Sequence, residues 1–247
     1  MKKGILISFE GPEGSGKSTH IQLLKSYLAG GVRSVIITRE PGGTTLAKAF
    51  RRLLLETGDG ILPLAELFLY EADRAQHVEE TVLPALKRGD IVLCDRYTDS
   101  TLAYQGFGRG LDKNVIRTLN RIASQDLIPD LTILLDVPVE RGLRQAHAKK
   151  KGHDRLERAG LAFHNRVRRG FLALARREPK RFCVVKQQKD LKDTQALIRG
   201  AVQKHLLPLR EKVAPTQSGE RRMRVPLTPR QTSGGTLSRR GRGSIQS

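Results

Sequence analysis

Apolar residues along the chain follow two kinds of pattern. Short apolar runs of strand length recur between longer stretches in which apolar residues repeat at helical spacing. The runs predict five strands, at residues 5–9, 34–38, 91–95, 131–136 and 182–185. The helical stretches lie at residues 21–28, 45–56, 63–87, 112–125, 157–177 and 191–206. One more begins at 138 and runs into a basic segment that starts at 149. Strands that alternate with helices predict an α/β fold, a five-stranded parallel sheet with helices on both faces.

The longest predicted helix, residues 63–87, carries both an apolar stripe and a polar pair. Pro63 suits its first turn, and Pro84 should bend or shorten its end. Tyr70 and Arg74 lie four residues apart, so they share one helix face, which we expect to project away from the core. The ring could stack on a base and the arginine could donate to a carbonyl oxygen, although an ordinary exposed Tyr–Arg pair is the alternative. The residues expected to face the core are Leu64, Phe68, Ala72, Ala75, Val82 and Leu86.

A glycine-rich loop follows the first predicted strand and precedes a helical stretch. Its sequence fits G-x-x-x-x-G-K-[ST], and strand, loop and helix in this order are the context in which that pattern binds a nucleotide. Glycines let backbone N–H groups wrap a phosphate closely, Lys17 reaches the β- and γ-phosphates, and Ser18 is placed to ligate Mg²⁺. The predicted nucleotide site consists of Gly11, Pro12, Glu13, Gly14, Ser15, Gly16, Lys17, Ser18 and Thr19.

Other polar residues lie where predicted parallel strands end, which is the edge at which such sheets bind ligands. Arg39 follows the second strand. Asp95 closes the third strand, in the position of a carboxylate on the Mg²⁺ side, and Arg96 after it can grip a phosphate bidentately. A structural Asp–Arg pair is the alternative. Residues that suit the polar edge of a base follow on a short turn-rich stretch: Ser100, Thr101 and Gln105.

A basic segment at residues 149–158 joins two predicted helices. Such a loop beside a phosphate site could close over the nucleotide, exclude water and add positive charge to the transferring phosphoryl group. A solvated run of charge is the alternative. The phosphate site favours the lid interpretation, because Gly14 and Ser15 supply no cation from the glycine loop. The basic residues include Lys149, Lys150, Lys151 and Arg155.

Charge and composition bound the possible partners. The chain has 247 residues and a net charge of +20. Residues 208–247, rich in Pro, Gly, Ser, Thr and Arg, hold 9 basic and 2 acidic residues and predict a disordered basic tail. The tail is either passive or a weak polyanion-binding arm. With no Trp and no aromatic-rich face, nucleic acid is not expected as the main partner.

The cysteines and the N-terminal residues indicate the compartment. Cys94 and Cys183 give neither a disulfide framework nor a metal-binding spacing, and Cys94 ends an apolar run, as a buried inert thiol would. The apolar run before Glu10 is too short for a secretory signal, and no run approaches membrane-spanning length. We therefore expect a cytoplasmic protein with no membrane association.

Six motifs, in order along the chain, closely resemble those of the bacterial thymidylate kinases (dTMP kinases), over residues 3–207. The resemblance implies a P-loop NTPase fold with a five-stranded parallel core and a lid at about 147–158, usually in a homodimer. It implies that ATP, with Mg²⁺, phosphorylates dTMP to dTDP. The tail from Pro208 lies outside it. The motifs are FEGPEGSGKST at 9–19, TREPGG at 38–43, EADRAQHV at 71–78, CDRYTDSTLAYQG at 94–106, PDLTILLDV at 129–137 and DRLE at 154–157.

The resemblance also implies seven dTMP-binding residues. Two arginines would hold the acceptor phosphate, and an acid would lie near the 3′-hydroxyl. A ring would stack on thymine, where the family usually has phenylalanine, an arginine would read a thymine carbonyl, and two polar side chains would touch the base. The two arginines are Arg39 and Arg96, the acid is Glu13, and the stacking ring is Tyr70. The arginine at the carbonyl is Arg74, and the two polar side chains are Ser100 and Gln105.

Catalytic charge would come from Lys17 and Arg96 together with a cation of the lid, because the glycine loop lacks the arginine that some family members carry there. Whether Lys151 or Arg155 supplies the lid cation stays open. The glycine-loop motif and the strand-end position predict Ser18 and Asp95 as the Mg²⁺ ligands.

Two other interpretations remain. One is a kinase for another nucleoside monophosphate, which would share the whole donor site. The other, from a different class, is a P-loop switch or nucleic-acid-binding protein. The paired arginines argue against a switch, because a switch needs no second phosphate site.

Overall fold

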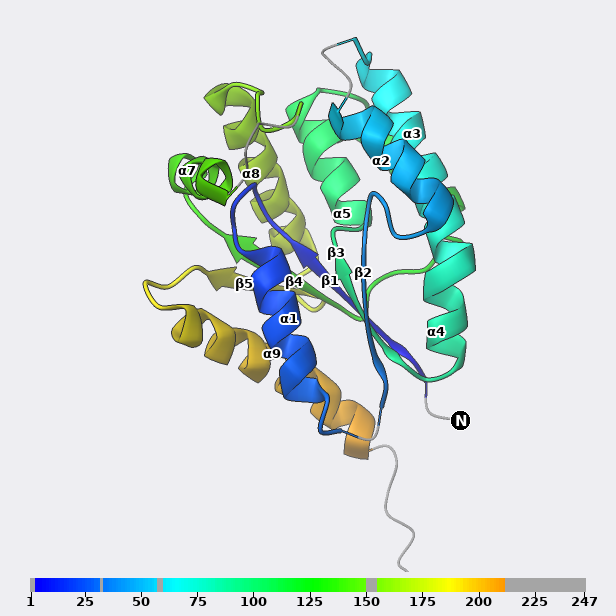
Figure 1. Cartoon of the computed structure of the whole chain (residues 1–247), viewed down its shortest axis with the longest axis vertical. Coiled ribbons are helices and arrows are strands. Elements are labelled where there is room, and N and C mark those ends of the chain that lie inside the picture. The colour runs from blue at the N-terminus through cyan, green and yellow to red at the C-terminus, as the bar shows by residue number, and fades with distance from the viewer. Residues whose placement is uncertain (1–2, 32, 57–59, 150–154, 212–247) are drawn as a thin grey trace, which may run out of the picture.

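The computed structural model describes residues 3–31, 33–56, 60–149 and 155–211. Five parallel strands form one sheet in the order β2-β3-β1-β4-β5, which confirms the predicted sheet. Helices cover both of its faces (Figure 1). The strands are β1 (Ile5–Glu10), β2 (Val35–Arg39), β3 (Ile91–Asp95), β4 (Leu131–Asp136) and β5 (Phe182–Lys186).

One layer of the core lies between the sheet and two helices, α1 (Lys17–Leu28) and α9 (Leu191–Glu211), which contact each other over the same face (Figure 1). Alternate residues of a strand point to the same face, so every second residue of β1, β3 and β4 enters this layer. The packing fixes the start of α1 beside the carboxyl end of β1. The buried residues include Ile5, Ile7, Phe9, Ile21, Leu24, Leu93, Ile133, Ile198 and Val202.

The remaining helices form two further clusters. In one, η1 (Val78–Val82) and α4 (Leu83–Lys87) bury apolar side chains against β1 and β3. In the other, α8 (Leu161–Arg177) packs on β4, β5 and η2 (Leu102–Gly108). The other helices are α2 (Thr45–Glu56), α3 (Pro63–His77), α5 (Thr98–Thr101), α6 (Lys113–Ala123) and α7 (Val139–Lys149).

The predicted helix at 63–87 is interrupted by a π-helical turn. α3 ends at His77, and within the turn the N–H of Leu83 donates to the Val78 carbonyl, five residues back. This wider spacing accommodates Pro84, which has no N–H to donate. The stretch after Tyr97 is also helical, because α5 continues into the π-helical η2, so the turn-rich prediction was wrong there.

The apolar stripe of α3 faces outward, contrary to the prediction. Leu64 and Phe68 are 51% and 52% exposed, whereas Arg74 is 1% exposed. Helical periodicity identifies two faces, but it cannot tell which one is buried when the buried face is polar and its hydrogen bonds are satisfied within the protein. The inward face of α3 consists of Glu66, Leu67, Glu71, Asp73, Arg74 and His77.

Other helix boundaries differ at their ends. α8 begins at Leu161 rather than near 157, and α9 continues to Glu211, beyond the predicted end at 206. The predicted disordered tail was wrong at its start, because residues 208–211 belong to α9. The rest of the tail, from 212 on, and the lid residues 150–154 lie outside the described residues. Among the described residues, no helix is both long and apolar enough to cross a membrane.

Asp73 provides a test of the buried polar face of α3. Its carboxylate accepts a hydrogen bond from the Gly42 N–H at 2.8 Å, and the side chain is fully buried. Burial, and after it the charge of Glu40, raises the pKa of Asp73 from 3.8 to about 7. A carboxyl whose pKa is higher in the folded than in the unfolded protein lowers stability above its folded pKa, and this cost shrinks as the pH falls.

We therefore expect Asp73→Asn, which keeps an oxygen acceptor for Gly42, to raise the free energy of unfolding more at pH 8 than at pH 5, by about 2 kcal/mol. Urea unfolding at both pH values measures the difference. The exposed Asp193 of α9 gives the control, because Asp193→Asn removes the same charge without a burial cost. An Asp73→Asn effect that is equal at both pH values would contradict the raised pKa.

Candidate active site

The glycine loop lies between β1 and α1 and has the backbone that its sequence requires. Gly11, Gly14 and Gly16 all have positive φ, at 141°, 66° and 86°. At Gly14 a side chain is also excluded by space, because a Cβ atom would collide with the Gly142 carbonyl of α7. The loop therefore passes close to α7 and leads directly into the N-terminus of α1, where backbone N–H groups attract anions.

Lys17, the first residue of α1, folds back over this loop. Its ammonium donates to the carbonyl oxygens of Gly11 at 3.1 Å and Pro12 at 3.0 Å. Burial, together with the charge of Arg96, lowers the pKa of Lys17 to about 8. A buried ammonium held by neutral carbonyls is well placed to bind an anionic phosphate.

Arg96 approaches the same loop from the carboxyl end of β3. Its Nη1 donates to the Gly11 carbonyl at 3.2 Å, and its Nη2 donates to Glu13 at 2.7 Å and to the Tyr104 hydroxyl at 3.0 Å. Lys17 and Arg96 therefore share one carbonyl oxygen as acceptor, so the structure brings the two predicted cations together at one edge of the sheet.

Glu13 balances these cations. Its carboxylate accepts hydrogen bonds from Arg96 and from the Tyr104 hydroxyl, the latter at 2.7 Å. Burial favours a raised pKa for Glu13, but the charges of Arg96 and Lys17 outweigh it and hold the pKa at about 2. Glu13 is thus ionised throughout the neutral range.

Ser18 and Asp95 meet on the exposed side of the loop, where the Ser18 hydroxyl donates to Asp95 at 2.7 Å. One hydroxyl and one carboxylate oxygen fit Mg²⁺, which typically takes one or two protein ligands and completes its shell with phosphates and water. Within the described residues, no group of three or more His, Cys, Asp or Glu side chains could hold a metal ion by itself. The pair therefore fits an ion that arrives with a nucleotide.

A cavity of about 430 Å³ connects these groups. The part of the glycine loop from Glu13 to Thr19 forms one wall, together with Asp95. Gly11 and Pro12 instead contribute the carbonyls that hold Lys17. All seven predicted dTMP-binding residues line the same cavity: Glu13, Arg39, Tyr70, Arg74, Arg96, Ser100 and Gln105.

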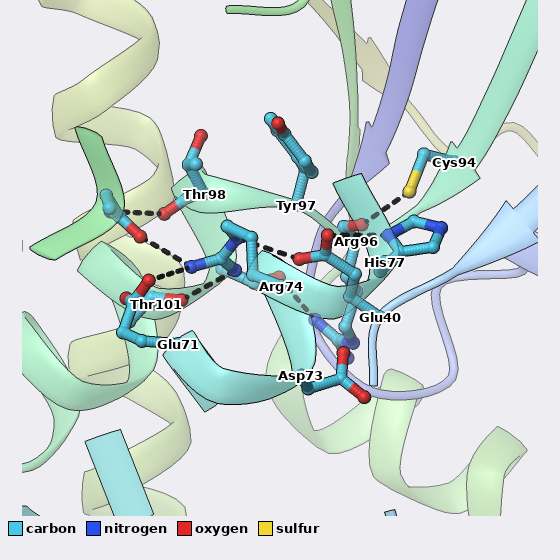
Figure 2. A network of polar contacts seen from close by, with 12 residues as sticks. Glu40, Glu71, Asp73, Arg74, His77, Cys94, Arg96, Tyr97, Thr98 and Thr101 are labelled. Atoms are coloured by element: carbon cyan, nitrogen blue, oxygen red, sulfur yellow. Dashed lines mark hydrogen bonds and ion pairs between the residues drawn. The ribbon is translucent and has the colours of Figure 1, made fainter. Parts of the chain in front are cut away.

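Arg74 is almost fully buried and makes four hydrogen bonds to described residues (Figure 2). Its Nε donates to Glu40 and its Nη1 to Glu71, both at 2.9 Å. Nη1 also donates to Asn120 at 2.6 Å, and Nη2 donates to Thr101 at 3.0 Å. A guanidinium has five N–H donors, so these described partners leave one N–H, on Nη2, for a ligand. The prediction that Arg74 projects away from the core was wrong, because the cavity lies inside the protein.

The base-edge candidates divide between the two arginines. Ser100 contacts Arg96: its hydroxyl oxygen accepts from Nη1 of Arg96 at 3.2 Å, and the same hydroxyl donates to Glu10 at 2.6 Å. The Thr101 hydroxyl oxygen instead accepts from Nη2 of Arg74. Gln105 is nearly fully buried, and its amide nitrogen donates to Glu66 at 2.6 Å.

Arg155 is not among the residues that line the cavity. It is buried in an ion pair with Glu66, and its Nε donates to the Leu54 carbonyl at 3.1 Å. The following residues, Leu156 and Glu157, line the cavity. Lys151, the other lid cation expected from the sequence, lies outside the described residues.

Sequence reasoning missed several acids and rings that orient the predicted residues. Glu40 and Glu66 hold Arg74 and Gln105, Tyr104 contacts Arg96, and Glu10 contacts Ser100. One signal was available for Glu10, an acid that directly follows an apolar strand. The partners of the others depend on tertiary packing, which the motifs do not encode.

Comparisons with known proteins agree with this geometry. The family model for thymidylate kinase matches residues 9–198. The thymidylate kinase of Geobacter sp. (strain M21) is 48% identical over 212 residues, which are 83% of this chain and 94% of that protein. That of Thermomicrobium roseum is 54% identical over 179 residues, 72% of this chain and 85% of that protein. The crystal structure of thymidylate kinase from Ehrlichia chaffeensis superposes with a TM-score of 0.68 at 34% identity and covers 81% of this chain and 100% of that one. The chain belongs to the thymidylate kinase family.

Proposed function

We propose that this protein transfers the γ-phosphoryl group of ATP to the 5′-phosphate of dTMP, giving dTDP. The observation that carries the proposal is the pair of cations on the Gly11 carbonyl. Lys17 comes from the start of α1, directly after the glycine loop, and Arg96 from the end of the neighbouring strand. Phosphoryl transfer needs two phosphate groups in line and their charge neutralised, and two cations converging from different elements supply this arrangement.

On the donor side, the glycine loop and Lys17 would hold the β- and γ-phosphates of ATP. Ser18 and Asp95 would hold Mg²⁺, and the ion would neutralise charge on the same phosphates. The lid would add a further cation. Because Arg155 is committed to Glu66 and Leu54, its placement supports giving the donor-facing role to Lys151.

On the acceptor side, Arg96 would bind the 5′-phosphate, with the exposed Arg39 at the mouth of the cavity. A phosphate monoester is mostly dianionic at pH 7, since its second pKa is about 6. Its oxygen can therefore attack the γ-phosphorus without a general base, and ADP leaves as the P–O bond to its β-phosphate breaks. Glu13 would accept from the deoxyribose 3′-hydroxyl.

The base would bind deeper in the cavity. Tyr70 would stack on it, and the remaining Nη2 hydrogen of Arg74 would donate to a carbonyl oxygen. The carboxylate of Glu66 can only accept hydrogen bonds, so it must bind the NH₂ group of Gln105. The carbonyl oxygen of Gln105 is therefore available to accept from an N–H of the base. Thymine offers both a carbonyl acceptor and an N3–H donor. Cytosine offers the opposite pair, which supports dTMP over dCMP.

We also propose that the protein is a homodimer. Exposed apolar residues lie on α3 and on the two helices that it contacts, α2 and α6. Apolar residues on adjoining surfaces in this number are typical of a protein interface rather than of free surface. They are Leu46 and Leu53 of α2, Leu64 and Phe68 of α3, and Val115 and Ile122 of α6.

Two further points concern the cellular compartment and nucleic acid as a partner. We keep a reducing cytoplasm as the expected compartment, supported by two free thiols, Cys94 and Cys183. Nucleic acid is not proposed as a partner, apart from weak binding by the basic residues 208–247.

The acceptor is identified most directly with a panel of dTMP, dUMP, dCMP, UMP and AMP, each with ATP and Mg²⁺. We expect dTMP to have the highest kcat/KM. Equal turnover of another monophosphate would favour the broader nucleoside monophosphate kinase, and nucleotide binding without turnover of any acceptor would favour a switch.

Substitution of Arg96 tests whether this residue binds the acceptor phosphate. We expect Arg96→Ala to lower kcat with dTMP by about a hundredfold or more, because an arginine aimed at a transferring phosphate can contribute a factor of about 10³. Steady-state kinetics measures this, with Arg88→Ala as control, since Arg88 lies before the same strand and its side chain is 58% exposed. A loss below tenfold would contradict the assigned role.

Phe68 tests the dimer. We expect Phe68→Glu to convert the protein to a monomer at micromolar concentration. Each subunit of the dimer would bring one glutamate charge into a desolvated apolar interface. Analytical ultracentrifugation measures the mass. Leu197→Glu is the control, because Leu197 is 50% exposed on α9, over the other face of the sheet. A Phe68→Glu protein that sediments like the wild type would refute this interface.

A further inference from the structure

The backbone of Arg96 is held in an unfavourable conformation. Its φ is +70°, in the left-handed region that residues with a Cβ atom rarely adopt. Such a conformation costs about 1–2 kcal/mol and persists only where surrounding contacts enforce it. The strain falls on the arginine that faces the acceptor phosphate, so the groups that enforce it also set the direction of that guanidinium.

Contacts from two strands fix the backbone on both sides of this residue. The N–H of Arg96 donates to the Phe9 carbonyl of β1 at 3.0 Å. The thiol of Cys94 donates to the Arg96 carbonyl, also at 3.0 Å. The next N–H along the chain, that of Tyr97, donates to the carboxyl group of Glu10 at 2.8 Å.

Glu10 also reaches the side chain of Arg96. Its second carboxyl oxygen accepts the Ser100 hydroxyl at 2.6 Å, and the Ser100 oxygen accepts from Nη1 of Arg96 at 3.2 Å. One carboxyl group therefore restrains both ends of the arginine, the backbone through Tyr97 and the guanidinium through Ser100. Glu10 itself is fully buried and is not among the residues that line the cavity.

We propose that Glu10 is a positioning residue for the acceptor phosphate: its two hydrogen bonds hold Arg96 in the left-handed conformation that aims the guanidinium at the substrate. This inference rests on the proposed function. It assigns Glu10 no contact with substrate, because both of its hydrogen bonds act through Tyr97 and Ser100 on Arg96.

The proposal requires hydrogen bonds rather than charge. Burial, and after it the charge of Asp99, raises the pKa of Glu10 to about 8, so the site disfavours a charge on this carboxyl group. A glutamine at this position keeps an oxygen that accepts from the Tyr97 N–H, and its NH₂ group can donate to the Ser100 oxygen, so the contact with Ser100 is kept with its direction reversed. An alanine keeps neither.

The test compares Glu10→Gln with Glu10→Ala in the full-length protein. We expect Glu10→Ala to lower kcat/KM for dTMP by about a hundredfold, the size of effect that a displacement near 1 Å can cause, while KM for ATP changes less than twofold. Glu10→Gln should stay within about threefold of wild type in all constants. Ser8→Ala is the matched control: Ser8 is a fully buried polar residue of the same strand that bonds Thr132, and its loss should spare both substrates.

A double-mutant cycle separates positioning from general damage. In the Arg96→Ala background, Glu10→Ala should have little further effect on kcat/KM for dTMP, because the group it acts through is gone. Multiplicative losses would overturn the proposal. So would a Glu10→Gln variant as impaired as Glu10→Ala, or equal losses for ATP and dTMP in Glu10→Ala.

The acceptor panel keeps this test distinct from the proposed function. If the wild-type protein were inactive with dTMP but active with another monophosphate, the proposed function would fail. The same variants, measured with that other acceptor, would still decide the role of Glu10.

Discussion

Two cations share one acceptor in this protein, the carbonyl oxygen of Gly11. Lys17 and Arg96 carry like charges, so each disfavours the other, and the lowered pKa of Lys17 records part of that conflict. Glu13 and the loop carbonyls stabilise the arrangement in the absence of phosphate. Positive charge fixed in advance is what a phosphoryl-transfer site needs, because the protein then does not reorganise when negative charge gathers there.

The sheet explains why these two residues meet. β1 and β3 are parallel neighbours in register, with Phe9 beside Asp95, so the loops that follow them emerge side by side. Lys17 comes from the helix after one loop and Arg96 from the end of the other strand. The third contributor, α3, presents its polar face to the same cavity and brings Tyr70 and Arg74 to it. Three elements distant in sequence thus supply the residues that we propose for binding the donor phosphates, the acceptor phosphate and the base.

The sequence predicted the sheet, the glycine loop and the meeting of the two cations, because strand-length apolar runs and loop motifs are local signals. It could not orient α3, whose exposed stripe contains Phe68 and whose buried face contains Arg74. An amphipathic pattern shows two faces, and only the satisfied ion pairs with Glu40 and Glu71 show that the charged face is inside.

Side-chain partners were also beyond the sequence. Ser100 and Thr101 are adjacent and chemically alike, yet one serves Arg96 and the other Arg74, because successive helical residues point about 100° apart. Arg155 was one of two candidates for the lid cation, and nothing in the sequence indicated that Glu66 binds it. The acid that binds Arg155 also binds Gln105, so one carboxylate connects the proposed lid with the proposed base site.

The central claim is that donor and acceptor phosphates are held at the same time by opposed cations. A ligand in which adenosine and thymidine are joined through their 5′ positions by a polyphosphate chain measures this directly, by calorimetric titration. The account predicts that wild type binds the joined ligand at least about a hundredfold more tightly than ATP or dTMP alone, and that Lys17→Ala and Arg96→Ala each abolish that gain. A joined ligand that binds no more tightly than its better half would contradict it.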